Sequence, residues 1–243
     1  MGHLTGLRAW YCTESGQQVL NAIEARTASL VSCVFGYYAV QMGRLGEQSD
    51  LLKNCTINQK LLVEWEGSSD IHADPSSLPF PRDSVDLVVL PNTLNFVDDA
   101  HQALREAERI LVPEGHVLIV GFNPYSYYGL WKLLKRRKGK APWTGTFYSL
   151  HRIKDWLSLL GFDVVQTEFV AHRPPFAHRK LYKNTAFLGR FGSKWINHGG
   201  GVYILLAKKR VATLKPLKEV WKPKKAIVPK EWAEPTTRGR FED

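Results

Sequence analysis

Cysteine is scarce in this sequence of 243 residues, which contains only Cys12, Cys33 and Cys55. Three thiols cannot all pair, and their spacing matches no metal-binding motif, so we expect neither a disulfide framework nor a metal site. Long apolar runs are scarce as well. The uncharged stretch 27–43 contains serine, glycine and glutamine, and it falls short of the roughly 20 apolar residues of a membrane-spanning helix. Residues 1–16 show no secretory signal. These absences predict a soluble protein of the cytoplasm.

Acidic residues are outnumbered, because 23 Asp and Glu stand against 33 Lys and Arg, for a formal net charge of +10. The excess is concentrated in the segment from Lys208 to Asp243, which holds eleven basic and five acidic side chains. Four prolines and few apolar residues besides two tryptophans make this composition typical of disorder. Two interpretations stay open: a solubilising appendage, or an arm that binds the phosphates of a polyanion. We expect a folded domain in residues 1–210 and a basic tail in residues 211–243.

The centre of the chain carries the clearest structural pattern. Residues 85–90 and 116–122 are short, mostly apolar runs, as expected of buried parallel strands. Between them, Asp98 or Asp99 can cap a helix whose apolar residues recur at spacings of three and four: Ala100, Ala103, Leu104, Ala107, Ile110 and Leu111. A proline and a glycine then end the helix. This order predicts a doubly wound α/β sheet with ligands at the carboxyl ends of its strands.

A family resemblance rests on four features in this order: Asp74, Leu78-Pro79-Phe80, Ser84-Val85-Asp86 and the helix end from Arg109 to Gly115. With the strand that follows, they resemble the latter half of a class I S-adenosylmethionine-dependent methyltransferase of the methyltransferase type 11 group. The resemblance extends more weakly through residues 147–210, with an insertion at about 171–201. It implies a Rossmann-like, mostly parallel twisted sheet with helices on both faces, shortened in its N-terminal half. It also implies S-adenosylmethionine as cofactor and an acceptor that the residues do not identify.

The glycine-rich loop of that family is altered here. In the family, the first strand ends in an acidic residue followed by three alternating glycines, which let the backbone approach the cofactor. The matching strand is residues 37–43, with Gln41 in the acidic position and Gly43 as the first glycine. Leu45 and Glu47 replace the other two glycines. The segment is therefore either a weakened cofactor loop or an ordinary turn, and we expect weak cofactor binding.

A second departure concerns the acid that binds the cofactor ribose in the family. Residues 60–65 form a predicted strand with Glu64 or Glu66 near its end. Too few residues follow before Ile71 for a crossover helix at about 1.5 Å per residue. We therefore expect a hairpin around the turn-rich residues 67–70. In that arrangement, a solvated acid on an edge strand is favoured over a ribose ligand.

The resemblance also implies specific cofactor contacts. Asp74 matches the family residue that hydrogen-bonds the adenine amino group, and the backbone of Ser77 and Leu78 would flank the ring. The end of the following strand would lie beneath the sulfonium, with the residues Leu90, Pro91 and Asn92. Asp74 also suits a turn before Pro75, and this alternative to the favoured ligand role stays open.

The catalytic residues are not identified by the sequence. His72, Asp98 and His101 lie near the predicted site in sequence, but none is singled out as a base. The main alternative to an enzyme is a catalytically inactive methyltransferase-fold binding module that uses its basic segments to contact nucleic acid or membrane. One such segment is the predicted helix 126–138, whose cations either cap the helix or place it on a membrane surface.

Overall fold

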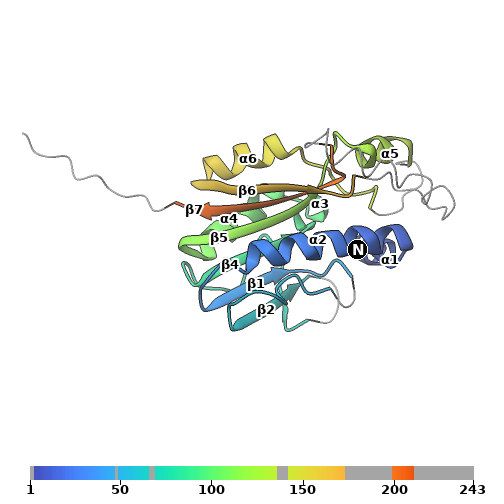
Figure 1. Ribbon diagram of the computed structural model, residues 1–243. Helices are drawn as coiled ribbons and strands as arrows, with labels where there is room; N and C mark the ends of the chain where they lie inside the picture. The colour runs from blue at the N-terminus through green and yellow to red at the C-terminus, as the bar shows by residue number, and fades with distance from the viewer. Residues whose placement is uncertain (1–2, 47–48, 66–68, 136–141, 173–198, 211–243) are drawn as a thin grey trace, which may run out of the picture. The chain divides into compact units, whose positions relative to one another are not determined.

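The computed structural model describes residues 3–46, 49–65, 69–135, 142–172 and 199–210, all within the first of two units, Met1–Val211. Its centre is a seven-stranded sheet with the strand order β3-β2-β1-β4-β5-β7-β6 (Figure 1). The strands are β1 (Tyr38–Met42), β2 (Gln59–Glu64), β3 (Ile71–His72), β4 (Val85–Pro91), β5 (Leu111–Phe122), β6 (Phe162–Val170) and β7 (Val202–Lys209). Most of the insertion and all of the tail beyond Arg210 lie outside the described residues.

Strand pairing confirms the Rossmann-like prediction. Neighbouring strands are parallel from β3 through β2, β1 and β4 to β5, whereas β7 is antiparallel to both β5 and β6. The predicted strands 85–90 and 116–122 pair with each other in the parallel register Leu87 to His116 through Pro91 to Val120. The crossover helix predicted between them is α4 (Ala100–Ile110).

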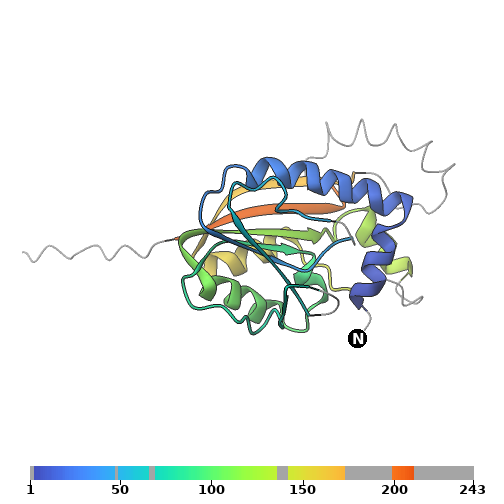
Figure 2. The same ribbon diagram turned by 90° about the horizontal axis from the view of Figure 1, so that it is seen from below.

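Helices cover both faces of the sheet. The long helix α2 (Glu14–Val31) lies on one face, and α4 and α6 (Leu150–Leu159) lie on the other (Figure 2). Successive side chains of a strand point to opposite faces. Accordingly, Leu87 and Val89 of β4 join the core beneath α2, while Val88 and Leu90 join the core beneath α4.

Side-chain caps begin the helices on the second face. Asp99 caps α4, because its Oδ1 accepts a hydrogen bond of 3.0 Å from the Gln102 N–H. Ser149 caps α6 in the same way through the Arg152 N–H. The predicted buried positions of α4 are confirmed up to Ile110, whereas Leu111 is buried as the first residue of β5. The apolar spacing continues to Leu111, but the backbone has already become extended there.

The hairpin predicted between β2 and β3 is wrong. The two strands are parallel, with Val63 opposite Ile71 and Glu64 opposite His72. A parallel return normally requires a crossover of a dozen residues or more. Here β3 is only two residues long and pairs with the last two residues of β2. The chain therefore has to return by only about two residues along β2 before β3 begins. The six residues between the two strands are enough for that.

Three further helices complete the described part of the chain: α1 (His3–Tyr11), α3 (Thr93–Phe96) and α5 (Tyr127–Lys135). Helix α1 lies at the end of the sheet where the parallel strands finish, and it runs across that edge (Figure 2). Among the described residues, none of the helices combines the length and apolar character needed to cross a membrane.

Candidate functional site

The carboxyl ends of β2, β1 and β4 lie side by side. In the sheet, Met42 of β1 pairs with Val63 of β2, and Gln41 pairs with Val89 of β4. The chain leaves β1 toward β2 on one side and reaches β4 on the other, so this is the point where the strand order reverses. Crevices at such switch points are the usual ligand sites of open α/β sheets.

Gly43 occupies the turn directly after β1. Its φ of +87° lies in the left-handed region, and its N–H donates a hydrogen bond of 2.7 Å to the Val63 carbonyl oxygen. A Cβ at this position would meet the Trp65 ring at 3.6 Å, which is an ordinary contact. The backbone conformation, and not a lack of space, therefore requires glycine here.

The two neighbouring departures from the family loop have structural roles. The buried Gln41 side chain donates to the Gly43 carbonyl oxygen at 2.9 Å and accepts from the Leu51 N–H at 3.0 Å. Leu45 is completely buried in the core beneath α2. Gln41 therefore fixes the loop through hydrogen bonds, and Leu45 fixes it through packing in the core.

Glu64 ends β2 as a buried residue, so the expectation of a solvated acid is wrong for Glu64. Glu66, the other candidate, lies outside the described residues. Arg8 of α1 donates a hydrogen bond of 2.6 Å to its carboxylate. A carboxylate removed from water requires such a partner. Strand β3 on one side and helix α1 at the strand end shield Glu64, and the sequence pattern of β2 showed neither.

Asn92 follows β4 and is also buried. Its backbone is left-handed, with φ of 56°, and its Nδ2 donates a hydrogen bond of 2.8 Å to the Tyr11 hydroxyl of α1. The Asn92 Oδ1 atom is buried without a hydrogen-bond partner. Burial raises the pKa of Tyr11 well above its ordinary value, with a smaller opposing effect from Asn92, so the hydroxyl stays neutral.

Helix α1 crosses this edge of the sheet and contacts both β2 and β5, which lie on either side of β1 and β4. Residues two apart in a helix point in nearly opposite directions. Arg8 accordingly reaches β2, while the Trp10 ring packs edge-on against Phe122 at the end of β5, with ring centroids 5.9 Å apart. Sequence reasoning missed this helix as part of the site. The available signal was Arg8, Trp10 and Tyr11 together in one short segment whose apolar Leu7 and Tyr11 share a face.

The loop after β3 places Asp74 at the same edge. One carboxylate oxygen of Asp74 accepts from the Ser76 N–H at 2.7 Å, and its backbone carbonyl oxygen accepts from the Ser77 N–H at 2.9 Å. Asp74 therefore does form the turn that was considered as an alternative. The other carboxylate oxygen has no hydrogen-bond partner among the described residues, and the side chain is exposed.

A salt bridge on α4 holds this loop in place. Glu106 accepts from the Leu78 N–H at 3.2 Å, and Arg109 donates to the carbonyl oxygens of Leu78 and Phe80 at 3.0 and 2.9 Å. Arg109 also donates to Glu106 at 2.8 Å, and these hydrogen bonds lower the pKa of Glu106 against the opposing effect of burial. The Leu78 backbone groups are therefore already bonded within the protein, and its side chain is buried.

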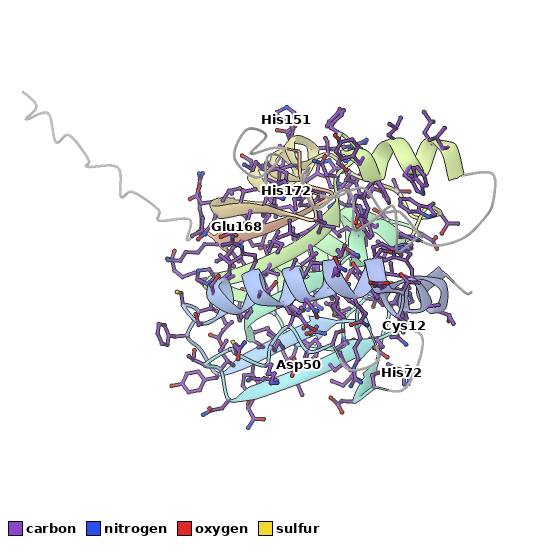
Figure 3. All side chains as sticks on the ribbon, turned by 45° about the vertical axis from the view of Figure 1, so that its right-hand side comes forward. Cys12, Asp50, His72, His151, Glu168 and His172 are labelled. Atoms are coloured by element: carbon purple, nitrogen blue, oxygen red, sulfur yellow. The ribbon has the colours of Figure 1, made fainter. Side chains whose placement is uncertain are left out.

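The remaining candidates are spread over the molecule. Leu90 and Pro91 are buried at the end of β4, whereas His101 packs on Trp156 with ring centroids 3.7 Å apart. His72 lies at the β3 end of the sheet, far from His151 and His172 on the other side (Figure 3). In the part of the chain that is described, no group of His, Cys, Asp and Glu has the arrangement of a metal site.

Comparisons with known proteins agree with this geometry. The model of a methyltransferase domain matches residues 31–119. The uncharacterized protein YafS of Escherichia coli is 30% identical over 207 residues, which cover 84% of this chain and 82% of YafS. The malonyl-[acyl-carrier protein] O-methyltransferase of Halorhodospira halophila is 40% identical, but over only 24% of this chain and 20% of its own length.

Solved structures show the same fold. A SAM-dependent methyltransferase from Thermotoga maritima superposes with a TM-score of 0.54 at 16% identity, over 86% of this chain and all of the other. A second one, from Archaeoglobus fulgidus, gives 0.54 at 19% identity over 78% of this chain and 94% of the other. This superfamily implies S-adenosylmethionine as the cofactor. The chain belongs to the class I S-adenosylmethionine-dependent methyltransferase superfamily, in one family with YafS.

Proposed function

We propose that the carboxyl edge of β2, β1 and β4 binds S-adenosylmethionine when α1 moves away from it. One observation carries this proposal: the buried polar groups at the ends of two of these strands are both held by α1. Arg8 pairs with Glu64, and Tyr11 accepts from Asn92. Displacing one helix would therefore free a carboxylate and an amide together, and the Asn92 Oδ1 atom already lacks a partner.

The predicted cofactor residues all have a role in this proposal, and Glu64, which the sequence did not favour as a ribose ligand, is added to them. Glu64 accepts hydrogen bonds from the ribose hydroxyls, and the Gly43 turn lets the backbone approach the methionine part. Asp74 accepts from the adenine amino group through its second oxygen. The other residues line the site: Ser77 and Leu78 beside the ring, and Leu90, Pro91 and Asn92 beneath the sulfonium.

The chemistry asks little of individual side chains. When bound, S-adenosylmethionine supplies a methyl group on a sulfonium, which a nucleophile displaces in line. The protein contributes alignment and the exclusion of water. Phe122 at the end of β5 and Tyr128 of α5 suit the second task, because their stacked rings, with centroids 6.1 Å apart, lie at this edge and do not belong to α1.

The relatives do not identify the methyl acceptor of this chain. One is named for malonyl-[acyl-carrier protein], and another, from Hahella chejuensis, for ubiquinone and menaquinone biosynthesis. The latter is 42% identical over 53 residues, and the former matches over 58 residues. Each segment covers less than a quarter of this chain, which is too little to assign the relative's acceptor to it.

A separate part of this proposal concerns the function of the basic tail. We assign the methyltransferase domain to residues 1–210 and a polyanion-contacting role to the tail. Three cations of the basic segment are already paired on the domain: Lys208 with Glu114, Lys209 with Asp83 and Glu108, and Arg210 with Asp163. The tail's contribution to phosphate binding therefore has to come from residues beyond Arg210.

Calorimetry with S-adenosylmethionine and S-adenosylhomocysteine tests the proposal directly. We expect weak binding to the wild type and several-fold tighter binding to Arg8→Met, because the variant no longer competes for Glu64. Glu64→Gln should bind about tenfold more weakly or worse, since hydrogen bonds to a charged group contribute roughly 1.5–3 kcal/mol. Arg82→Met, which changes an exposed arginine away from α1, is the matched control.

Absence of binding heat and of any thermal shift at millimolar ligand, in both wild type and Arg8→Met, would reject the methyltransferase function. The chain would then be the catalytically inactive binding module considered as the alternative. Binding that is equal in all variants would keep the enzyme but remove Glu64 and α1 from the site.

A further inference from the structure

The outer face of helix α5 is unusual for a helix that faces water. Leu130, Leu133 and Leu134 are 58%, 72% and 66% exposed, and Tyr125 and Tyr127 next to them are exposed too. A surface helix normally carries polar side chains on that face. Scattered exposed leucines need no explanation, but several neighbouring ones on one helix mark an interaction surface. We call these five residues the α5 apolar face.

The inner side of α5 is firmly packed, so the outer face has a defined orientation. Tyr128 is buried and stacks with Phe122, with ring centroids 6.1 Å apart. Gly129 allows a close approach, since a Cβ there would lie 1.8 Å from the Pro124 carbonyl oxygen. Lys132 lies over the Phe147 ring at 4.3 Å. Helix α5 is therefore fixed to the domain through its inner side, and the exposed leucines lie on the opposite side of a packed helix.

The charge of the surrounding sequence indicates what covers the α5 apolar face. The forty residues 115–154 contain eight Lys or Arg and no Asp or Glu. Helix α5 lies in the middle of this acid-free stretch, and basic residues follow it directly in sequence. Leucine and tyrosine side chains combined with cations and no acids are the composition of helices that lie in the interface of anionic membranes.

Other occupants match these observations less well. A second copy of the chain would bring together two stretches that carry positive charge without acids, and such like-charge contacts are unfavourable. Nucleic acid would use the cations but leave three exposed leucines in contact with phosphates and water. A membrane interface uses both the apolar side chains and the charge.

We propose that the α5 apolar face docks this protein on anionic lipid bilayers, with the leucines inserted between headgroups. Tyr128 on the inner side of α5 packs against Trp10 of α1, with ring centroids 6.3 Å apart. Docking through α5 therefore places the carboxyl edge of the sheet, and the helix that crosses it, beside the bilayer. The proposal does not depend on methyl transfer, because it concerns a surface outside the cofactor residues.

Vesicle co-sedimentation of the full chain tests this docking. We expect binding to vesicles of phosphatidylcholine and phosphatidylglycerol in equal amounts, and weak binding to phosphatidylcholine alone. The double variant Leu133→Glu/Leu134→Glu should lower the partition coefficient by about tenfold or more, because two inserted side chains are lost. Leu159→Glu is the matched control, since Leu159 is 85% exposed on α6 near the opposite edge of the sheet and should bind like wild type.

Each alternative outcome overturns the proposal. Equal partitioning of the double variant and the wild type would mean that charge elsewhere, including the tail, carries the binding. Absence of vesicle binding combined with a dimer that the double variant dissociates would make the face a contact between copies. All variants differ only at exposed side chains, so their thermal unfolding should match that of wild type and confirm that they are folded.

Discussion

Arg8 and Glu64 lie 56 residues apart in sequence, yet the Arg8 guanidinium donates to the Glu64 carboxylate at 2.6 Å. The Glu64 side chain is only 2% exposed, while that of Arg8 is 22% exposed. The pair fastens α1 across the carboxyl ends of the parallel strands. It also occupies the carboxylate at the end of β2 that we propose as the ligand of the cofactor ribose.

The first prediction concerns the stability of this pair. Arg8→Met should lower the free energy of unfolding by about 2–4 kcal/mol, because it leaves the Glu64 carboxylate buried without its partner. The double variant Arg8→Met/Glu64→Gln should recover part of that loss, since the buried charge is then gone. Urea unfolding of the four proteins gives the double-mutant cycle. Strictly additive effects would show that the two side chains do not interact in solution.

The second prediction separates the backbone of Asn92 from its side chain. Asn92→Ala should destabilise the protein by roughly 2–3 kcal/mol, because alanine tolerates the left-handed conformation poorly and the hydrogen bond to Tyr11 is lost. Asn92→Gly removes the same hydrogen bond but suits the positive φ, so it should cost less. Thermal unfolding measures both, and Tyr11→Phe is the control for the hydrogen bond alone. A glycine variant less stable than the alanine variant would refute the backbone argument.

The third prediction tests Asp74 as an adenine ligand. Asp74→Ala should weaken cofactor binding by roughly 1–3 kcal/mol, the usual loss for a charge-assisted hydrogen bond. Calorimetry provides the measurement, with Asp98→Ala as control, because Asp98 is another exposed acid in a nearby loop. Unchanged affinity in a folded variant would assign Asp74 to its turn with Ser76 alone.

The fourth prediction is a pH dependence. The hydrogen bonds from Arg109 place the pKa of Glu106 below its ordinary value of 4.5, so between these two values the unfolded chain binds more protons. The stability that this pair contributes is therefore fully present above about pH 4.5, and it is lost as the pH falls through the lower pKa that Glu106 has in the folded protein. Glu106→Gln should be less stable at neutral pH and lose less stability on acidification. Urea midpoints across the acid range measure this, and parallel curves would contradict it.

The fifth prediction concerns the tail. Ending the chain after Val211 should leave cooperative unfolding intact, because the last strand, β7, finishes at Lys209. If the tail binds polyanions, the truncation should sharply lower affinity for RNA, DNA or anionic vesicles, and full-length binding should weaken steeply with salt. Equal affinity of the two proteins would leave the tail as a solubilising appendage. Loss of cooperative unfolding would show that the tail packs on the domain.

The sequence alone determined the local elements and the superfamily. The apolar runs of β4 and β5, the helical periodicity of α4 and the cap at Asp99 depend on neighbours a few residues away, so they are visible in the sequence. The altered glycine loop was visible for the same reason, because Gln41, Gly43 and Leu45 lie together in sequence. The solvated environment expected for Glu64 was wrong because burial depends on what packs on a strand.

The tertiary structure decided the site. Nothing in the helical pattern of α1 says that Arg8 reaches β2 while Tyr11 reaches Asn92, 81 residues away. Such contacts depend on how α1 crosses the sheet edge, and that is fixed by the packing of Trp10 and Leu7 on residues far along the chain. The parallel pairing of β3 was likewise decided by register with β2, since turn-rich residues permit either a hairpin or a short parallel return. Periodicity reports which face of an element is apolar, but the partner of that face is chosen only when the whole chain folds.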